Sequence, residues 1–185
     1  MPLPPTELVP LCAGHILLRA YTPADLPALL TAFADEDITR WNPGPAGRDA
    51  AAAAATWMER RNDWSGGDHA SWAVADPGGQ LLGSVSLHKF DVEQGDAEAG
   101  YWIAPWAHGR GTGTLALATA ARFAFTGLQL HRLHLYHAVE NVWSCRVAAV
   151  AGFSLEGRLR QSWKYADGDY HDEHLHARLA SDPPS

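Results

Sequence analysis

The 185-residue sequence is poor in cysteine, with only two in the whole chain. Cys12 and Cys145 lie far apart, whereas a disulfide-stabilised small domain needs several pairs. The sequence therefore argues against a disulfide framework and favours a reducing, intracellular environment. We expect a cytoplasmic protein.

Long apolar runs and basic clusters are also absent from the sequence. No stretch approaches the roughly 20 apolar residues of a membrane-spanning helix, and no basic segment followed by an apolar one suggests a secretory signal. The net charge is −7 with histidine counted as neutral. Because nucleic-acid affinity comes largely from neutralising phosphates, this charge argues against such a partner. We expect neither a membrane nor a nucleic-acid partner.

The overall composition of the chain is typical of one globular domain. Hydrophobic residues make up 46% of the chain and charged residues 19%, an ordinary balance for a folded domain with a substantial core. Prolines gather at both ends, which predicts loose tails at residues 1–12 and 181–185. A single domain is expected over residues 13–180.

Hydrophobic spacing and turn residues predict a mixed order of strands and helices. The expected strands lie near residues 15–20, 70–76, 80–90, 98–103, 130–138, 153–165 and 170–179. The expected helices lie near residues 25–33, 48–64, 112–127 and 141–151, the last with Trp143, Val147, Val150 and Ala151 facing inward. This order predicts an α/β (α+β) domain, with a mostly antiparallel mixed sheet of about six to seven strands and about four helices.

The most informative segment is the glycine loop at residues 108–114, with the sequence HGRGTGT, between a strand and a helix. Alternating glycines let the backbone turn sharply, and the following helix offers free N–H groups, so the loop suits a pyrophosphate. A P-loop would need a lysine here, and a dinucleotide fingerprint would need glycine in place of Thr114. A glycine-rich turn without a ligand is the alternative.

Two further segments accompany the loop: EAGYWIAP at residues 98–105 and ENVWSCRVA at residues 140–148. In this order and spacing, the sequence resembles the GNAT superfamily of N-acetyltransferases over about residues 15–179, and more specifically its RimJ/RimL-type group, whose named members acetylate the N-termini of ribosomal proteins. The resemblance implies the GNAT fold and transfer of an acetyl group from acetyl-CoA, the co-substrate, to a primary amine. It implies no metal.

The resemblance also implies which residues bind acetyl-CoA. The pantetheine arm is expected beside Trp102, Ile103 and Ala104. The pyrophosphate is expected in the loop formed by His108, Gly109, Arg110, Gly111, Thr112, Gly113 and Thr114. The family usually has arginine or glutamine where this chain has His108, so we expect acetyl-CoA affinity to vary with pH.

For the chemistry, the resemblance implies that Glu98 accepts the proton of the amine and that Ser144 protonates the leaving thiolate. Asn141 is expected to hold the arm of the co-substrate, to cap its helix, or both. Tyrosine is the acid in many GNAT enzymes, but its usual position is occupied here by Phe153 and Ser154. Cys145 is expected to be a packing residue rather than a nucleophile.

Candidate contacts of the amine are Trp41, Trp72 and His88. The segment at residues 171–176, HDEHLH, would place Asp172, His174 and His176 on one face of a strand, as a three-ligand metal set or as a polar solvent face. Because acyl transfer to an amine needs no metal, we expect none.

The expected function is therefore direct attack of an amine on acetyl-CoA in a ternary complex, the acceptor being a protein or peptide N-terminus or a small amine such as an antibiotic or metabolite. Two alternatives are an acyl-CoA-binding sensor without catalysis and a nucleotide-phosphate enzyme with an irregular loop. The sequence fixes neither the acceptor nor the acyl length. It is compatible with a homodimer.

Overall fold

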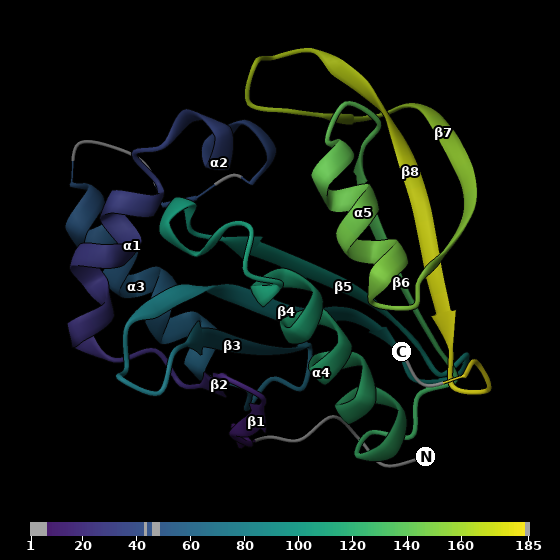
Figure 1. Ribbon diagram of the computed structural model, residues 1–185, viewed down its shortest axis with the longest axis horizontal. Coiled ribbons are helices and arrows are strands. Elements are labelled where there is room, and N and C mark those ends of the chain that lie inside the picture. Colours follow the sequence, from purple (N-terminus) through teal and green to yellow (C-terminus); the bar gives the residue numbers. More distant parts are fainter. Residues whose placement is uncertain (1–6, 43, 46–48, 184–185) are drawn as a thin grey trace.

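A computed structural model describes residues 7–42, 44–45 and 49–183. Over these residues the chain forms an eight-stranded sheet and five α-helices (Figure 1). The expected α/β fold with a mixed sheet is confirmed, with slightly more elements than expected. The expected helix start at Arg48 and the outer parts of both expected tails lie outside the described residues.

The sheet has the strand order β1-β2-β3-β4-β5-β6-β8-β7. Its strands are β1 (Leu11–Ala13), β2 (Ile16–Arg19), β3 (His69–Ala75), β4 (Leu81–Asp91), β5 (Asp96–Ile103), β6 (Arg132–Ala138), β7 (Ser154–Lys164) and β8 (Tyr170–Leu179). Only β5 and β6 pair in parallel, and the other neighbours are antiparallel. β1 was not expected, and it begins inside the segment expected to be an N-terminal tail.

The helices are α1 (Leu26–Ala32), α2 (Glu36–Trp41), α3 (Ala50–Asn62), α4 (Thr112–Thr126) and α5 (Val142–Val150). Helix α2 was not expected, because its six residues are too few to show a hydrophobic period. Its start signal is nevertheless present. The side chain of Asp35 caps the helix by accepting hydrogen bonds from the backbone N–H groups of Asp37 and Ile38.

A separate cluster of buried residues lies on each face of the sheet. Helix α4 packs on one face, against a cluster that includes Trp72, Leu87 and Leu117, while α1 and α3 pack on the other, against a cluster that includes Ala73 and Trp102. Adjacent residues such as Trp72 and Ala73 belong to different clusters because successive side chains of a strand point to opposite faces.

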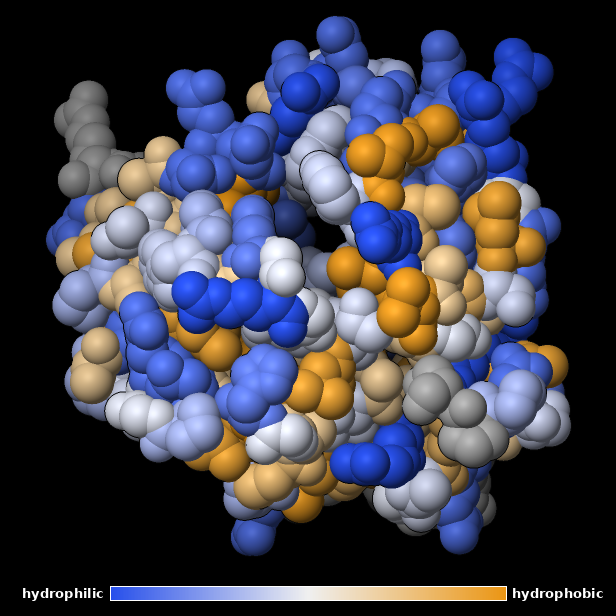
Figure 2. Space-filling view, in the orientation of Figure 1, coloured by the Kyte–Doolittle hydropathy of each residue, from blue (hydrophilic) through white to orange (hydrophobic). Residues whose placement is uncertain are grey.

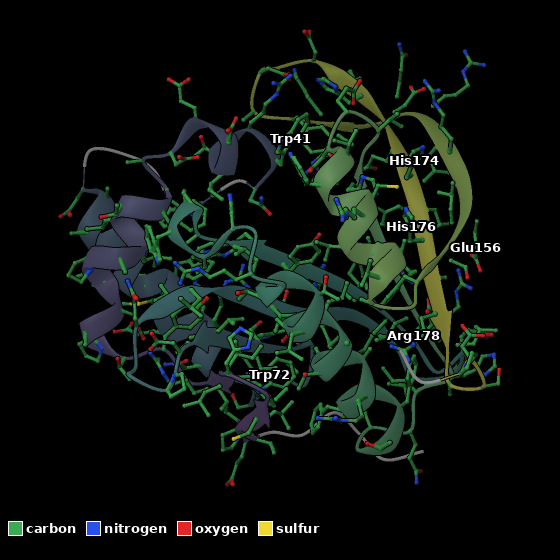
Figure 3. The ribbon with its side chains drawn as sticks, viewed as in Figure 1. Trp41, Trp72, Glu156, His174, His176 and Arg178 are labelled. Atoms are coloured by element: carbon green, nitrogen blue, oxygen red, sulfur yellow. The ribbon has the colours of Figure 1, made fainter. Side chains whose placement is uncertain are left out.

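Trp72 is a core residue, which corrects the expectation that it contacts a bound amine. Its side chain is 0% exposed and packs edge-on against Trp64 and Phe123, with ring centroids 4.9 and 5.5 Å away. Its indole N–H donates to the Val9 carbonyl at 2.8 Å. Figure 3 shows Trp72 far from Trp41, the other tryptophan expected to contact the amine.

The outer surface of α5 is apolar, contrary to expectation. Trp143 and Val150 were expected to face inward, but they are 73% and 60% exposed. The inner side of this helix is formed by Ala148, which is fully buried, and by the half-buried Val147. The expectation is confirmed for Val147 and Ala151, which pack in the core. Hydrophobic residues surround α5 rather than forming one stripe, so their spacing alone placed Trp143 and Val150 on the wrong side.

Strand β7 forms one edge of the sheet. It pairs only with β8, and its pairing is interrupted by irregularities between Leu155 and Gly157 and between Leu159 and Trp163. Almost every residue of this strand is exposed.

Among the helices that the structure describes, none is both long enough and apolar enough to cross a membrane.

We predict that Trp72→Ala lowers the free energy of unfolding by about 3–5 kcal/mol, because it leaves a cavity in the core. Trp143→Ala, the same substitution at an exposed site, should change it by less than about 0.5 kcal/mol. Urea denaturation followed by circular dichroism measures both values. Equal losses in the two variants would contradict the assignment of Trp72 to the core.

Candidate active site

The sheet divides between β5 and β6. These strands pair only over Asp96–Glu98 with Arg132–His134, although β5 continues to Ile103 and β6 to Ala138. Beyond Glu98 the two strands part, and Figure 1 shows them diverging, with α4 and α5 both on the near face of the sheet. The second half of β5 therefore has an open edge.

Hydrogen bonding to β4 determines which backbone groups of β5 face this open edge. The N–H of Ala104 donates to the Leu82 carbonyl at 2.8 Å. Because backbone groups alternate in direction along an antiparallel strand, Trp102 and Ala104 direct theirs toward β4, and Tyr101 and Ile103 direct theirs toward the open edge. Of the three residues expected beside the pantetheine arm, only Ile103 offers its backbone there, and the sequence analysis missed Tyr101.

The glycine loop, residues 108–114, follows β5 at the mouth of the gap. Gly109 and Gly111 have φ values of +72° and +73°, in the left-handed region that favours glycine. A Cβ at either position would meet no atom within 4 Å, so the backbone angle, not space, calls for glycine. At Gly113 a Cβ would lie 3.2 Å from Ile103 Cγ1. This glycine lets α4 approach β5 closely.

The first turn of α4 has free hydrogen-bonding groups. Gly111 stands at its N-cap, and no side chain caps the helix. The hydroxyl of Thr112 is buried and has no hydrogen-bond partner among the described residues. Arg110 and His108 lie exposed on the loop, and His108 Nε2 donates to the Ile103 carbonyl at 2.8 Å. Free amides, an unused hydroxyl and a nearby guanidinium suit a diphosphate.

The start of α5 lies across the gap from β5. Asn141 caps this helix, its Oδ1 accepting from the Ser144 N–H at 3.1 Å, which leaves its amide nitrogen available to another group. The Ser144 hydroxyl and the Tyr101 hydroxyl are hydrogen-bonded at 2.9 Å. Burial raises the pKa of Tyr101 to about 12, although the hydrogen bond with Ser144 opposes this rise. Tyr101 is therefore a proton donor at neutral pH.

Figure 2 shows a deep hollow between α2, the loop that precedes α4 and the N-terminal end of α5. Trp41 ends α2 and reaches toward the turn between β7 and β8 (Figure 3). Its ring packs edge-on against Tyr165 and His171, with centroids 5.4 and 6.2 Å away. Trp41 thus connects α2 with the β7–β8 turn.

Glu98 stands where β5 and β6 part, and its side chain is only 15% exposed. His88 of β4 and His134 of β6 are its partners across the sheet. Its carboxylate lies 3.2 Å from His88 Nε2, 2.8 Å from Lys89 Nζ and 3.8 Å from His134 Nε2. Burial alone would raise the pKa of Glu98, but these three neighbours outweigh burial and hold it far below its usual range.

The other charged groups around Glu98 are paired as well. Asp96 lies 3.0 Å from His134 Nδ1, and Glu156 forms a two-point ion pair with Arg132. The hydrogen bond to Glu98 raises the pKa of His134 against the effect of burial, and Asp96 adds to the rise. Beside this cluster, a surface hollow of about 610 Å³ includes His88 and Lys89 in its lining.

The metal set considered for residues 171–176 does not assemble. The carboxylate of Asp172 binds the Arg158 guanidinium and the Gln161 N–H. His174 and His176 lie instead beside His137 and Cys145. The Cys145 sulfur is 3.7 Å from His176 Nε2, a neighbour that sequence proximity did not suggest.

Comparison with known proteins assigns this arrangement to a family. Residues 15–154 match the family described as "Acetyltransferase (GNAT) domain". The match covers well over half of the chain, and the chain belongs to this family. GNAT acetyltransferases use acetyl-CoA as their acetyl donor.

Similar proteins include the ribosomal-protein-serine acetyltransferase of Escherichia coli (strain K12), 34% identical over 101 residues, with 54% of this chain and 55% of the relative covered. The spermidine N(1)-acetyltransferase of Vibrio cholerae serotype O1 (strain ATCC 39315 / El Tor Inaba N16961) is 32% identical over 101 residues, with 55% and 58% covered. The chain thus spans somewhat more than half the length of these curated relatives. Mycobacterium smegmatis RimJ, solved in complex with CoA-disulfide, superimposes with a TM-score of 0.81 at 26% identity, over 92% of this chain and 84% of that chain.

We predict that Gly111→Ala weakens binding of coenzyme A roughly 5–30-fold, because a left-handed angle costs a residue with a Cβ roughly 1–2 kcal/mol. The exposed loop is expected to relax in the free protein, so binding must restore the strained angle. Isothermal titration calorimetry measures the effect. Gly157→Ala is the control, since its Cβ would meet nothing within 4 Å and its φ is not positive. Equal affinities of the two variants would exclude this role for the loop.

Proposed function

We propose that this chain is an acetyl-CoA-dependent N-acetyltransferase that acetylates the α-amino group of a protein or peptide. The observation that carries the proposal is the open edge of β5, which runs from the glycine loop to Glu98. Family membership and the likeness to a RimJ solved with a coenzyme A disulfide support it.

Three sets of groups would hold acetyl-CoA, which supplies the acetyl thioester when bound. The amides of the glycine loop, with Arg110 and His108, would bind the diphosphate. The backbone groups of Tyr101 and Ile103 would pair with the pantetheine arm as an added strand does. The free amide nitrogen of Asn141 would bind the same arm from α5. The buried, unpartnered Thr112 hydroxyl favours this fit.

Charge pairing near Glu98 favours an acceptor with a single amine. Asp96, Glu98 and Glu156 are each already within ion-pair distance of an arginine or a lysine, whereas a polyamine carries several charges that need free carboxylates. An α-amino group, with a pKa of about 7.7–8.0, is neutral in roughly a tenth of molecules at pH 7. A lysine-like amine is neutral in roughly one in 2,500. An α-amino group therefore depends less on a general base to remove its proton.

The proton of the amine would pass to the pair formed by Glu98 and His88. A carboxylate with a strongly lowered pKa is a weak base by itself, so we assign proton uptake to the imidazole and its orientation and charge balance to Glu98. This differs from the expectation that Glu98 itself accepts the proton of the amine. Trp41, at the hollow, remains a candidate contact of the acceptor.

Ser144 would donate a proton to the departing thiolate, with Tyr101 behind it. The 2.9 Å hydrogen bond between the two hydroxyl groups would let Tyr101 replace the proton that Ser144 gives up, and Tyr101 would then take a proton from solvent after the products leave. Because Tyr101 stays protonated at neutral pH, it can act in this direction. The usual family acid is a tyrosine from elsewhere in the chain, and here a tyrosine of β5 would assist a serine of α5.

We predict that Glu98→Gln lowers kcat/KM roughly 100-fold, because it removes the carboxylate that orients the His88 imidazole and balances its charge while the imidazole accepts the proton. Thiol release in a steady-state assay measures this loss. The control is Glu93→Gln in the exposed β4–β5 turn, which should stay within twofold of the parent. A Glu98→Gln variant within a few-fold of the parent would remove Glu98 from the mechanism.

We predict that Ser144→Ala lowers kcat roughly 10²-fold with little change in the KM for acetyl-CoA, and that Tyr101→Phe causes a smaller loss. If the hydroxyl groups act as one relay, the double variant should be no slower than Ser144→Ala alone. Multiplicative losses would show that the two groups act independently.

The acceptor is tested by screening peptides with free N-termini, the same peptides with blocked N-termini, and spermidine for thiol release and product mass. The proposal requires turnover of the free peptides only. A second candidate is a small amine, favoured by the similarity to a spermidine acetyltransferase, and selective spermidine turnover would establish it. Tight coenzyme A binding without turnover of any amine would indicate a sensor.

A further inference from the structure

Four side chains with metal-ligating atoms meet beneath α5. His137 comes from β6, Cys145 from α5, and His174 and His176 from β8, where Figure 3 shows the last two. His137 is the register partner of His174. One ligand atom from each residue lies within 4.8 Å of all the others. The acyl transfer proposed above uses none of these four.

The spacing of these atoms is close to that of a tetrahedral site. Zn–N and Zn–S bonds of roughly 2.0–2.3 Å place tetrahedral ligand atoms roughly 3.3–3.8 Å apart. The Cys145 sulfur and His176 Nε2 are 3.7 Å apart, within this range. Small side-chain movements would bring the other atoms, now within 4.8 Å, to the same spacing.

Hydrogen bonds fix the tautomers of two of the histidines. His137 Nδ1 donates to the Ala138 carbonyl at 2.8 Å, and His176 Nδ1 faces the Phe153 carbonyl at 3.3 Å. A carbonyl oxygen only accepts, so Nδ1 carries the hydrogen and Nε2 keeps its lone pair. A metal-binding histidine usually donates the N–H of its other ring nitrogen to a carbonyl or carboxylate in the same way.

The cluster contains polar atoms that lack partners. His137 is 5% exposed, and its Nε2 has no hydrogen-bond partner among the described residues. The Nδ1 of His174 is also buried and has no hydrogen-bond partner among the described residues. Leaving such atoms unsatisfied is costly, so each native case calls for an explanation.

We propose that His137, Cys145, His174 and His176 bind one Zn²⁺ ion. One thiolate and three imidazoles in a tetrahedral arrangement suit Zn²⁺ among the divalent ions. On binding, the Cys145 thiol loses its proton to solvent and its sulfur becomes a thiolate ligand. Four protein ligands leave no open position, so the ion stabilises the fold and takes no part in the reaction.

The ion would link α5 to β6 and β8 through its ligands. Cys145 is next to Ser144 in α5, and the same helix is capped by Asn141. Zinc at this point would hold in place the helix that carries these groups. The site itself rests only on the four ligands, so it stands or fails independently of the proposed acetyl transfer.

Cobalt substitution tests the ligands. Untagged protein, stripped with a chelator and titrated with Co²⁺, should show visible bands of tetrahedral intensity and a near-ultraviolet thiolate-to-cobalt band, with one ion per chain. The thiolate band should disappear in Cys145→Ser and persist in Cys12→Ser, the matched control at the exposed cysteine. Absence of Co²⁺ binding by the parent protein, or a thiolate band that survives Cys145→Ser, would overturn the site.

A second measurement uses the parent protein alone and does not depend on a variant that folds. Zinc should protect Cys145, but not Cys12, from alkylation, as read by mass spectrometry. Free Zn²⁺ at about 100 times its Kd should raise the melting temperature by roughly 5–10 °C. Equal alkylation of both cysteines and an unchanged melting temperature would show that the histidines pack without a metal.

Discussion

The parting of β5 from β6 after Glu98 is the constraint on which the rest of the structure depends. Three pairs of residues join the two strands, and beyond them no strand of the described residues pairs with β5 on that side. Buried backbone groups without partners are costly, so this edge must be satisfied by water or by a ligand. An extended molecule that brings its own donors and acceptors is a natural complement. The glycine loop and the start of α5 both lie at this opening.

The alternation of side chains along β5 separates the two halves of the proposed reaction. Glu98 and Trp102 point to the face covered by α1 and α3, where the charged cluster and the hollow near His88 are found. Tyr101 points to the other face, toward Ser144. In the proposed reaction, one strand would therefore supply groups to the incoming amine on one side and to the leaving sulfur on the other.

The sequence predicted those parts of the site whose residues are close together in the chain. The glycine loop was recognisable because the alternation of Gly109, Gly111 and Gly113 has a local cause in backbone geometry. The pairing of Asn141 with Ser144 was predictable because one helical turn separates them. The α/β class followed from the order of elements in the same way.

Features that join distant segments could not be predicted in this way. The contact of Tyr101 with Ser144 spans 43 positions, and the Cys145 sulfur reaches His176 only because α5 lies on β8. The exposure of Trp143 was missed because helical spacing does not show which side of a helix the sheet covers. The charge state of Glu98 depends on neighbours from two other strands, β4 and β6, and no pattern in one segment reveals it.

The interrupted pairing of β7 affects how this molecule behaves beside copies of itself. A straight, apolar strand at the margin of a sheet can recruit another chain and nucleate fibrils. Here the register shifts interrupt the ladder, and Arg160 and Lys164 place positive charge beside the exposed side chains of Leu155, Leu159 and Trp163. Both features oppose edge-to-edge pairing of β7 with the β7 of a second copy.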